Sequence, residues 1–353
     1  MIKENLMSTG PTITGLLKTL QRTTPRFSRR GLLALGAGCA AELLAPAAQA
    51  QAWPGKPIHI AIPAPPGGPT DVLARLISDK LSPRLGQPVV VDNRPGASGI
   101  LGIDAVAKAA PDGYTFLIAL SVQILGNQFM FEKLPYNVDR DFVLVSQLVA
   151  ISGGIVVVHP SVTATTGPQL LQYVASRKGT LSYGSYGMGT FPHLIFSHMS
   201  QTQNADMVHA LYKGEAPMVQ DLIGGQFQMS VVSALLAKPH IESGKLKAIG
   251  VAGANRNSAV PNLATLSEQG LTDEAYSLGG FFGMAAPANT PKEIVQRMAR
   301  EVKSVCDMPE VSGRLESLGW KVTAGTPEEF VASWKKAYPV WEKLIRQSGV
   351  KAE

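Results

Sequence analysis

Residues 58–73 read IHIAIPAPPGGPTDVL, and this stretch decides the class of fold. The first five residues form a short apolar run, which is typical of a buried strand. The proline- and glycine-rich segment after it predicts a loop. Thr70 or Asp71 then caps a helix, because apolar residues recur with a period near 3.6 as far as Leu81. The pattern is therefore strand, glycine loop, helix.

The same unit returns along the chain. Further strands are predicted at 88–91, 114–120, 180–184, 208–212, 226–232 and 246–252, and amphipathic helices close the chain near 291–307 and 327–348. Alternation of short apolar strands with amphipathic helices predicts parallel α/β sheets that helices cover on both faces. We expect an α/β protein of two lobes, each a mostly parallel sheet flanked by helices.

Four of the predicted loops contain glycine and lead into a helix. A helix N-terminus presents unpaired N–H groups and a partial positive charge, so it favours anions. Glycine lets the backbone approach a ligand closely. Because ligands of doubly wound sheets bind at the carboxyl ends of the strands, several such loops in one cleft would hold one or two carboxylates. The alternative is that these glycines only make tight turns.

The net charge of +6 is concentrated at the N-terminus. Residues 1–50 hold six of the 32 basic residues and two of the 26 acidic ones, which leaves +2 for the rest of the chain. No basic run with interleaved aromatic residues follows, so nucleic acid is not an expected partner.

Residues 1–50 are interpreted as an export signal of the twin-arginine type. They contain SRRGLL at 28–33, a short apolar stretch at 31–41 and the small-residue cleavage motif AQA at 48–50. The apolar stretch is too short to span a membrane. We therefore expect a periplasmic protein with a cleavable signal. Cleavage after Ala50 or after Ala52, and the twin-arginine or the general secretory route, both stay open.

Motifs for catalysis, metals and cofactors are missing from the sequence. There is no P-loop, and Gly96, Gly99 and Gly102 are wrongly spaced for dinucleotide binding. The YGSYG run at 183–187 has tyrosine where a nucleophile elbow needs glycine. The six histidines are scattered, and Cys306 is expected to be a structural thiol. We predict no enzyme activity, no metal and no cofactor.

Several motifs together resemble one known family. They are WP at 53–54, PPGGPTDVLAR at 65–75, NRPGASG at 93–99, PDGYT at 111–115, LPYN at 134–137, GMGT at 187–190, YKG at 212–214, GGQ at 224–226 and APANTP at 286–291. In this order they resemble the Bug family, the periplasmic solute-binding receptors of tripartite tricarboxylate transporters. The resemblance implies a periplasmic-binding-protein (Venus-flytrap) fold. Lobe one would comprise residues 53–155 plus 276–353, and lobe two residues 156–275.

The resemblance also implies a binding site. In the family, the loop after the first strand and the Asn-Arg-Pro-Gly loop grip a ligand carboxylate through backbone amides, which corresponds here to Pro66, Gly67, Gly68, Thr70 and Asp71 with Ala97 and Ser98. Asp71 is interpreted as a helix cap, since two negative charges would repel. The other expected binding residues are Ser121, Tyr186, Gly187, Met188, Gly189, Thr190, Lys213, Gly214 and Ser233.

Three departures from the family pattern bear on the ligand. Ser121-Val122-Gln123-Ile124 stands where the family has a small or hydroxyl residue, a glycine and a histidine, and Tyr186 and Met188 replace the common serine and asparagine. Residues 231–233 read VVS where an aspartate often reaches the cleft. The hypothesis is a less polar and even aromatic carboxylate.

The predicted function is capture of a small organic carboxylate by closure of two lobes. The partner would be membrane transporter subunits or a sensor, and the receptor itself is expected to be a monomer. An enzyme on the same scaffold is the alternative, and a nucleophile–base pair in the cleft would distinguish it.

Overall fold

The first sheet grows out of the strand at the start of the quoted stretch. β1 (Ile58–Ile62) pairs in parallel with β2 (Val89–Asn93) and with β3 (Thr115–Leu120). Antiparallel pairings add β10 (Gly280–Pro287), β4 (Phe142–Ile151) and β11 (Trp320–Val322). The order is β11-β4-β10-β3-β1-β2. The computed structural model describes residues 53–152 and 154–350.

The second sheet is formed by the middle of the chain. Its order is β7-β6-β8-β5-β9, with strands β5 (Gly154–Val158), β6 (Ser182–Ser185), β7 (Val208–Leu211), β8 (Met229–Val232) and β9 (Lys247–Ala252). β6 pairs in parallel with β7 and β8, whereas β5 pairs antiparallel with β8 and β9. The two-lobed α/β prediction is confirmed, but both sheets are mixed rather than mostly parallel.

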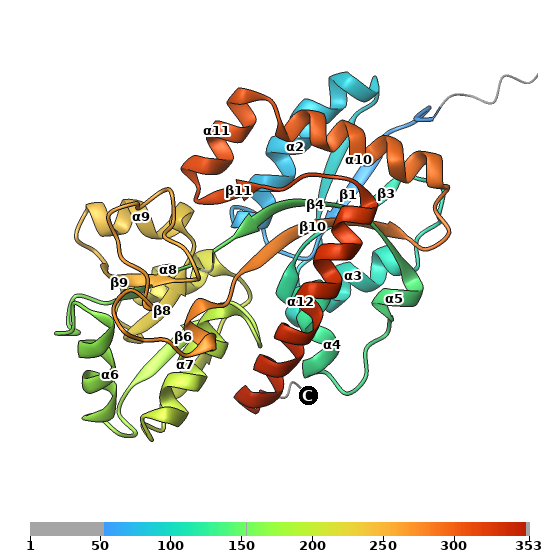
Figure 1. The fold of residues 1–353 in the computed structure, drawn as a ribbon. Coiled ribbons are helices and arrows are strands. Elements are labelled where there is room, and N and C mark those ends of the chain that lie inside the picture. The colour runs from blue at the N-terminus through green and yellow to red at the C-terminus, as the bar shows by residue number, and fades with distance from the viewer. Residues whose placement is uncertain (1–52, 153, 351–353) are drawn as a thin grey trace, which may run out of the picture. The chain divides into compact units, whose positions relative to one another are not determined.

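The mixed strand directions have a topological cause. The chain leaves the first sheet at the end of β4 and enters the second at β5, then returns from β9 to β10 (Figure 1). β4, β5 and β10 thus carry the connections between the sheets, and each of them makes antiparallel pairs. The predicted lobe boundary between residues 155 and 156 falls inside β5.

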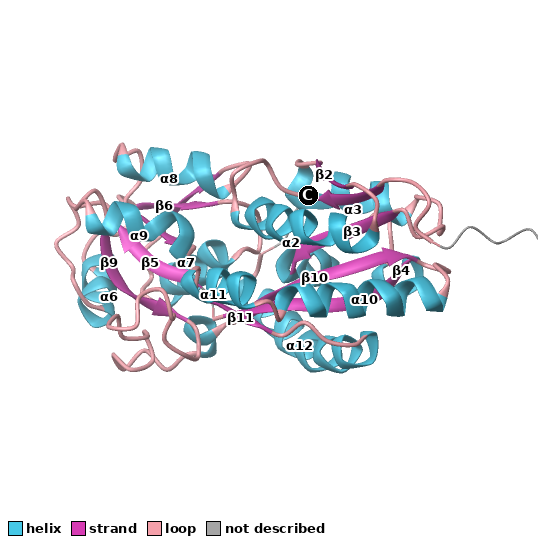
Figure 2. Ribbon diagram, turned by 90° about the horizontal axis from the view of Figure 1, so that it is seen from above, coloured by secondary structure: helices cyan, strands magenta, loops and turns pink. Residues whose placement is uncertain are grey.

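Helices lie outside both sets of strands (Figure 2). They are α2 (Pro69–Leu85), α3 (Ile100–Ala107), α4 (Asn127–Met130), α5 (Val138–Asp141), α6 (Gly167–Ala175), α7 (Phe191–Thr202), α8 (Glu215–Ile223), α9 (Ala234–Glu242), α10 (Lys292–Cys306), α11 (Pro309–Ser317) and α12 (Pro327–Ser348), with short helical turns at Ala97–Gly99, Val122–Gly126 and Glu274–Ser277. α2 begins earlier than predicted, because Gly68 is its N-cap and Pro69 its first residue, a position that favours proline.

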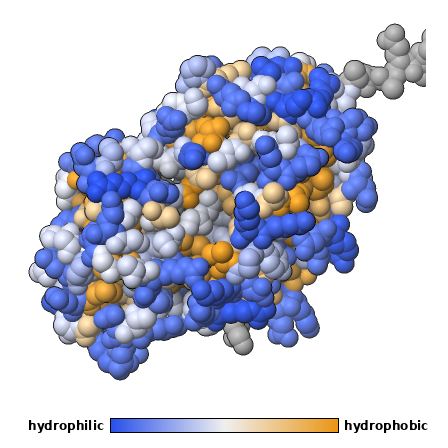
Figure 3. All heavy atoms as spheres, viewed as in Figure 1, coloured by the Kyte–Doolittle hydropathy of each residue, from blue (hydrophilic) through white to orange (hydrophobic). Residues whose placement is uncertain are grey.

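The core explains why the strands are apolar runs. Ile58, Ile60 and Ile62 of β1 and Val156 and Val158 of β5 belong to one continuous apolar cluster that includes side chains from both sheets. Charged and polar residues cover most of the face in Figure 3, with smaller apolar patches between them. Burial on this scale is the main favourable term in folding.

Three sequence predictions concern other parts of the chain. The predicted export signal at 1–50 lies outside the described residues. Cys306 is fully buried at the end of α10, and burial raises the pKa of its thiol to about 12, as expected of a structural cysteine. Within residues 53–152 and 154–350, no helix combines the length and the apolar character that crossing a membrane requires.

Candidate functional site

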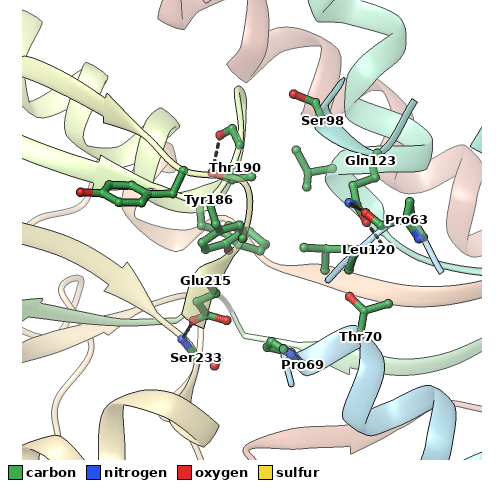
Figure 4. Close-up of a pocket in the computed structure, with 18 of the residues that line it drawn as sticks. Pro63, Pro69, Thr70, Ser98, Leu120, Gln123, Tyr186, Thr190, Glu215 and Ser233 are labelled. Atoms are coloured by element: carbon green, nitrogen blue, oxygen red, sulfur yellow. Dashed lines mark hydrogen bonds between the residues drawn. The ribbon is translucent and has the colours of Figure 1, made fainter. Parts of the chain in front are cut away.

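A cavity of about 700 Å³ lies between residues of the first sheet's loops and residues of the second sheet's loops. In Figure 4, Pro63, Thr70, Ser98 and Gln123 lie on one side, and Glu215 and Ser233 face them from the other. Each wall is built from loops that follow strands and precede helices. The position agrees with the predicted convergence of glycine loops on one cleft.

The N-terminus of α2 forms one end of the first wall. Gly68 and Thr70 line the cavity, and the hydroxyl of Thr70 points into it (Figure 4). The first hydrogen bond within α2 runs from Val72 N to Gly68 O at 3.0 Å. The amides of Thr70 and Asp71 precede that bond, so they have no acceptor within the helix. This end of a 17-residue helix favours an anion.

Asp71 supports the loop rather than lining the cavity. The prediction that Thr70 or Asp71 caps α2 was wrong, because Gly68 is the N-cap and Asp71 is the third residue of the helix. It accepts hydrogen bonds from Gly67 N at 3.1 Å, Arg75 Nε at 3.0 Å and Asn93 Nδ2 at 2.9 Å. Burial opposes ionisation, but the hydrogen bonds from Arg75, Gly67 and Asn93 outweigh it and hold the pKa of Asp71 below its usual value. Pro66 and Gly67, two of the expected binding residues, are exposed and lie outside the lining.

The loop before α3 contributes a second set of amides to this wall. Ala97 and Ser98, both of which line the cavity, have φ angles of 46° and 53°. Non-glycine residues rarely adopt this left-handed conformation, and such strain concentrates at ligand sites. Successive backbone N–H groups in a turn can form a concave anion-binding site. Asn127 Nδ2 donates to Ser98 O at 3.2 Å and holds the loop in place.

Gln123 connects the two parts of the first wall, and it was not among the expected binding residues. Its Nε2 donates to Pro63 O at 2.9 Å, and its Oε1 accepts from Leu120 N at 3.3 Å. Gln123 lines the cavity. The neighbouring Ser121, which was predicted to bind ligand, is instead fully buried and accepts a hydrogen bond from Phe281 N at 3.3 Å.

The loop between β6 and α7 forms part of the second wall. Four of the expected binding residues line the cavity here: Tyr186, Gly187, Met188 and Thr190. Thr190 Oγ1 donates to Gly187 O at 2.7 Å, which closes the loop. Burial, and secondarily the charge of Glu215, raises the pKa of Tyr186 well above its usual value.

Gly189, another of the expected binding residues, lies outside the lining. Its amide donates to His193 Nδ1 at 3.0 Å. Its φ is 64°, and a Cβ there would lie 1.9 Å from Met130 Sδ. Gly189 therefore allows a close approach between this loop and α4, and glycine is required for backbone and contact alike.

A serine–histidine pair lies beneath this loop. Ser185 Oγ is 2.6 Å from His209 Nε2, and His209 stacks on His193 with ring centroids 4.1 Å apart. Burial lowers the pKa of His209 to about 4, and burial with the nearby His209 lowers the pKa of His193 to about 3. Ser185 is fully buried, lies outside the cavity lining and donates to Gly187 O at 3.1 Å. The pair holds the loop from behind rather than meeting the cavity.

The starts of α8 and α9 complete the second wall. Three expected binding residues, Lys213, Gly214 and Ser233, line the cavity, and so does Glu215. Glu215 accepts a hydrogen bond from Ser233 N, and only 7% of its surface is exposed. Burial raises the pKa of Glu215 to about 7. Residues 231–233 carry no acidic side chain, but Glu215 at the start of α8 places one in this wall.

The remainder of the cavity is largely apolar. Phe131, Leu318 and Trp320 line it, together with Phe282 of β10. Helix starts bring backbone donors to both walls. Apolar surface surrounds them, which is the usual composition of a small-molecule site. Among the described residues, no three His, Cys, Asp or Glu side chains are grouped so as to hold a metal ion.

Comparisons with known proteins point to one family. The family model described as "Tripartite tricarboxylate transporter family receptor" matches residues 73–350. A UPF0065 protein in the tcbD-tcbE intergenic region of Pseudomonas sp. (strain P51) is 35% identical over 91% of this chain and 96% of its own length. Protein BugT of Bordetella pertussis is 30% identical over 91% of this chain and 98% of its own length.

Solved structures agree with these matches. The structure titled "R. palustris Rpa4515 with adipate" is 30% identical, has a TM-score of 0.79, and matches over 84% of this chain and 98% of its own. MatC of Rhodopseudomonas palustris with bound malate is 28% identical, with a TM-score of 0.77 over 83% of this chain and 100% of its own. The chain therefore belongs to the tripartite tricarboxylate transporter receptor family, and the predicted resemblance to Bug receptors is confirmed.

Proposed function

We propose that this protein is a periplasmic receptor that captures a small organic carboxylate in the cavity between its two walls. The observation that carries the proposal is the pair of backbone-amide sites on the first wall, at Thr70–Asp71 and at Ala97–Ser98. Two anion-favouring backbone sites on one wall suit the two oxygens of a carboxylate. The adipate and malate in the titles of similar structures support this ligand class.

The apolar part of the cavity would hold the carbon skeleton. Phe131, Phe282 and Trp320 offer aromatic surface, which supports the hypothesis of a weakly polar or aromatic acid. An isolated carboxylate in such surroundings costs several kcal/mol unless donors meet it. The helix N-terminus and the left-handed loop supply those donors.

Capture would proceed by approach of the two lobes, with boundaries near residues 155 and 276. The walls already lie close at two points, where Gly214 faces the Pro65 ring and Gly189 faces Met130. Closure would exclude water and so strengthen each amide–carboxylate bond. Membrane transporter subunits or a sensor would then recognise the closed monomer.

The experiment is a thermal-shift measurement on purified protein that has been unfolded in urea and refolded to remove carried-over ligand. The panel comprises mono-, di- and tricarboxylates, aromatic acids and amino acids. Binding to the native state alone adds about 2.7 kcal/mol at a hundredfold excess over Kd, which raises Tm by several degrees. Absence of any shift across the panel would refute the carboxylate proposal.

Thr70→Val tests the location of binding. The variant keeps the shape of the side chain and removes the hydroxyl that faces the cavity (Figure 4). A lost hydrogen bond to a charged group is worth about 1.5–3 kcal/mol, so affinity should fall by about tenfold or more. Thr163→Val, an exposed position outside the cavity lining, is the matched control and should leave affinity unchanged. Equal affinity in both variants would place the ligand elsewhere.

A further inference from the structure

Glu215 is out of place in a site that binds anions. It is the first residue of α8, lines the cavity and is 7% exposed. A carboxylate of the protein and a second carboxylate of a ligand would repel in the low dielectric of a closed site. Binding of the first carboxylate at the opposite wall gives no reason for an acid here. The presence of Glu215 in the cavity lining therefore needs a separate explanation.

The protein provides a hydrogen-bond donor to one of the two carboxyl oxygens of Glu215. One oxygen accepts from Ser233 N, the amide of the residue that caps α9. The other oxygen has no hydrogen-bond partner among the described residues, and the group faces the cavity in Figure 4. The hydroxyl of Ser233 is buried beside the same carboxyl group. The second oxygen of Glu215 is thus left for a ligand to meet.

No cation of the described residues is paired with Glu215. Lys213 lies two residues before it and is exposed. The charge of Glu215 contributes to the raised pKa of Tyr186 in the β6–α7 loop. Across the cavity, Asp71 is already paired with Arg75. The negative charge of an ionised Glu215 therefore has to be met by a donor that arrives with the ligand.

We infer that Glu215 selects the far end of the ligand: the preferred class is a monocarboxylate that carries a hydroxyl or amine remote from its carboxylate, and a second ionised carboxylate is disfavoured. The inference rests on the proposed function, because it takes the first carboxylate to lie at the N-terminus of α2. A ligand hydroxyl or ammonium would donate to the unpaired oxygen of Glu215.

The discrimination should be large enough to measure easily. A buried charged group left without its partner costs more than a neutral one, and a tenfold change in affinity corresponds to about 1.4 kcal/mol. We expect a preference of at least about tenfold for the hydroxy or amino acid over the diacid of equal length. Burial raises the pKa of Glu215 to about 7, so the preference should be strongest at pH 8 and weaker at pH 6.

The experiment is calorimetric titration of the full chain with matched acids of four, five and six carbons. Each length is tested as the diacid, the terminal hydroxy acid and the terminal amino acid, at pH 8 and at pH 6. Glu215→Gln removes the charge and keeps the shape. Glu293→Gln, at an exposed position of α10, makes the same change of net charge away from the cavity.

The expected result has three parts. The unmutated protein and Glu293→Gln prefer the hydroxy or amino acid at pH 8, Glu215→Gln gains about tenfold or more for the diacid, and acidification to pH 6 improves diacid binding only where Glu215 is present. The inference is overturned if the diacid binds the unmutated protein as tightly as its hydroxy counterpart at pH 8, or if Glu215→Gln leaves the ratio unchanged. The pH comparison alone decides the matter should the variant fail to fold.

Failure of the proposed function is distinguishable from failure of the inference. If no acid of any length binds the unmutated protein at either pH, and the wider panel also gives no thermal shift, the carboxylate receptor itself is refuted and the inference falls with it. If diacids bind well and selectivity ignores Glu215, the receptor stands and only the inference is lost.

Discussion

Acid should loosen the second wall through two stacked histidines, His193 and His209. His193 accepts a hydrogen bond from Gly189 N through Nδ1, and His209 contacts Ser185 Oγ. Protonation would remove the acceptor on His193 and place two positive charges in rings 4.1 Å apart. Both groups hold the β6–α7 loop, which carries four of the residues that line the cavity. The perturbation that tests this is His209→Gln, which keeps a polar group and cannot be protonated.

The sign and the size follow from the pKa values. The folded pKa of His209 is about 4 and its ordinary value is 6.5. Between these pH values the imidazole is protonated in the unfolded chain and neutral in the folded chain. Stability is fully present above pH 6.5 and is lost as the pH falls toward 4, by about 1.4 kcal/mol per pH unit and about 3 kcal/mol in all. His193, with a folded pKa of about 3, adds a slope of the same sign, and the two losses are coupled because each charge repels the other.

The assay is urea denaturation between pH 7.5 and pH 4.5, followed by tryptophan fluorescence. We expect the free energy of unfolding of His209→Gln to fall less steeply than that of the unmutated protein, by about 1.4 kcal/mol per pH unit. His240→Gln removes a half-exposed histidine of α9 and is the control for the loss of one imidazole. Parallel slopes for the unmutated protein and His209→Gln would refute the reasoning, whatever the offset between them.

Three further predictions concern the cavity walls. Glu215→Gln should stabilise the ligand-free protein at pH 8 by up to about 3 kcal/mol and have little effect at pH 4. The reason is that a carboxyl with a raised pKa loses its contribution to folding stability as the pH rises from 4.5 to about 7. An equal difference in unfolding free energy between variant and unmutated protein at both pH values, measured by urea titration, would contradict this. Gln123→Leu leaves two backbone groups unpaired and should cost about 2 kcal/mol or more in unfolding free energy at pH 7, whereas a neutral result would mean that water replaces the amide. Gly214→Ala places a Cβ 2.5 Å from the Pro65 ring without backbone strain, so affinity measured by calorimetry should fall about five- to a hundredfold while Gly313→Ala, in open space, binds normally; equal affinities would argue against closure at this point.

The first wall could be predicted largely from the sequence because its chemistry is local. A strand, a glycine loop and a helix start within a dozen residues, and Gly68 and Thr70 reach the cavity for that reason. The same local pattern could not say which way the loop turns. Pro66 and Gly67 are exposed. The hydroxyl of Ser121 accepts a hydrogen bond from Phe281 N of β10, 160 residues later, and so distant a contact is not visible in the local sequence.

The second wall was less predictable because its polar groups depend on distant contacts. An acidic residue at the start of a helix is normally an exposed partner of the helix dipole, and nothing near Glu215 in the sequence distinguishes it from that. Its burial follows from Ser233, 18 residues later, whose amide it meets. Gln123 is a similar case, since its partner Pro63 lies 60 residues earlier.

Opposite titrations in one wall predict the pH at which this part of the protein is most stable. Between pH 4.5 and 6.5 the two histidines raise stability as the pH rises, while Glu215 lowers it, so the net gain is that of about one proton. From pH 6.5 to about 7 only Glu215 still changes its charge, and stability falls. The maximum should therefore lie near pH 6.5. Glu215→Gln should turn it into a plateau that extends to higher pH, and His209→Gln should flatten the rise below it. If the unmutated protein, Glu215→Gln and His209→Gln are all most stable at the same pH, His193, His209 and Glu215 do not control the pH dependence of stability.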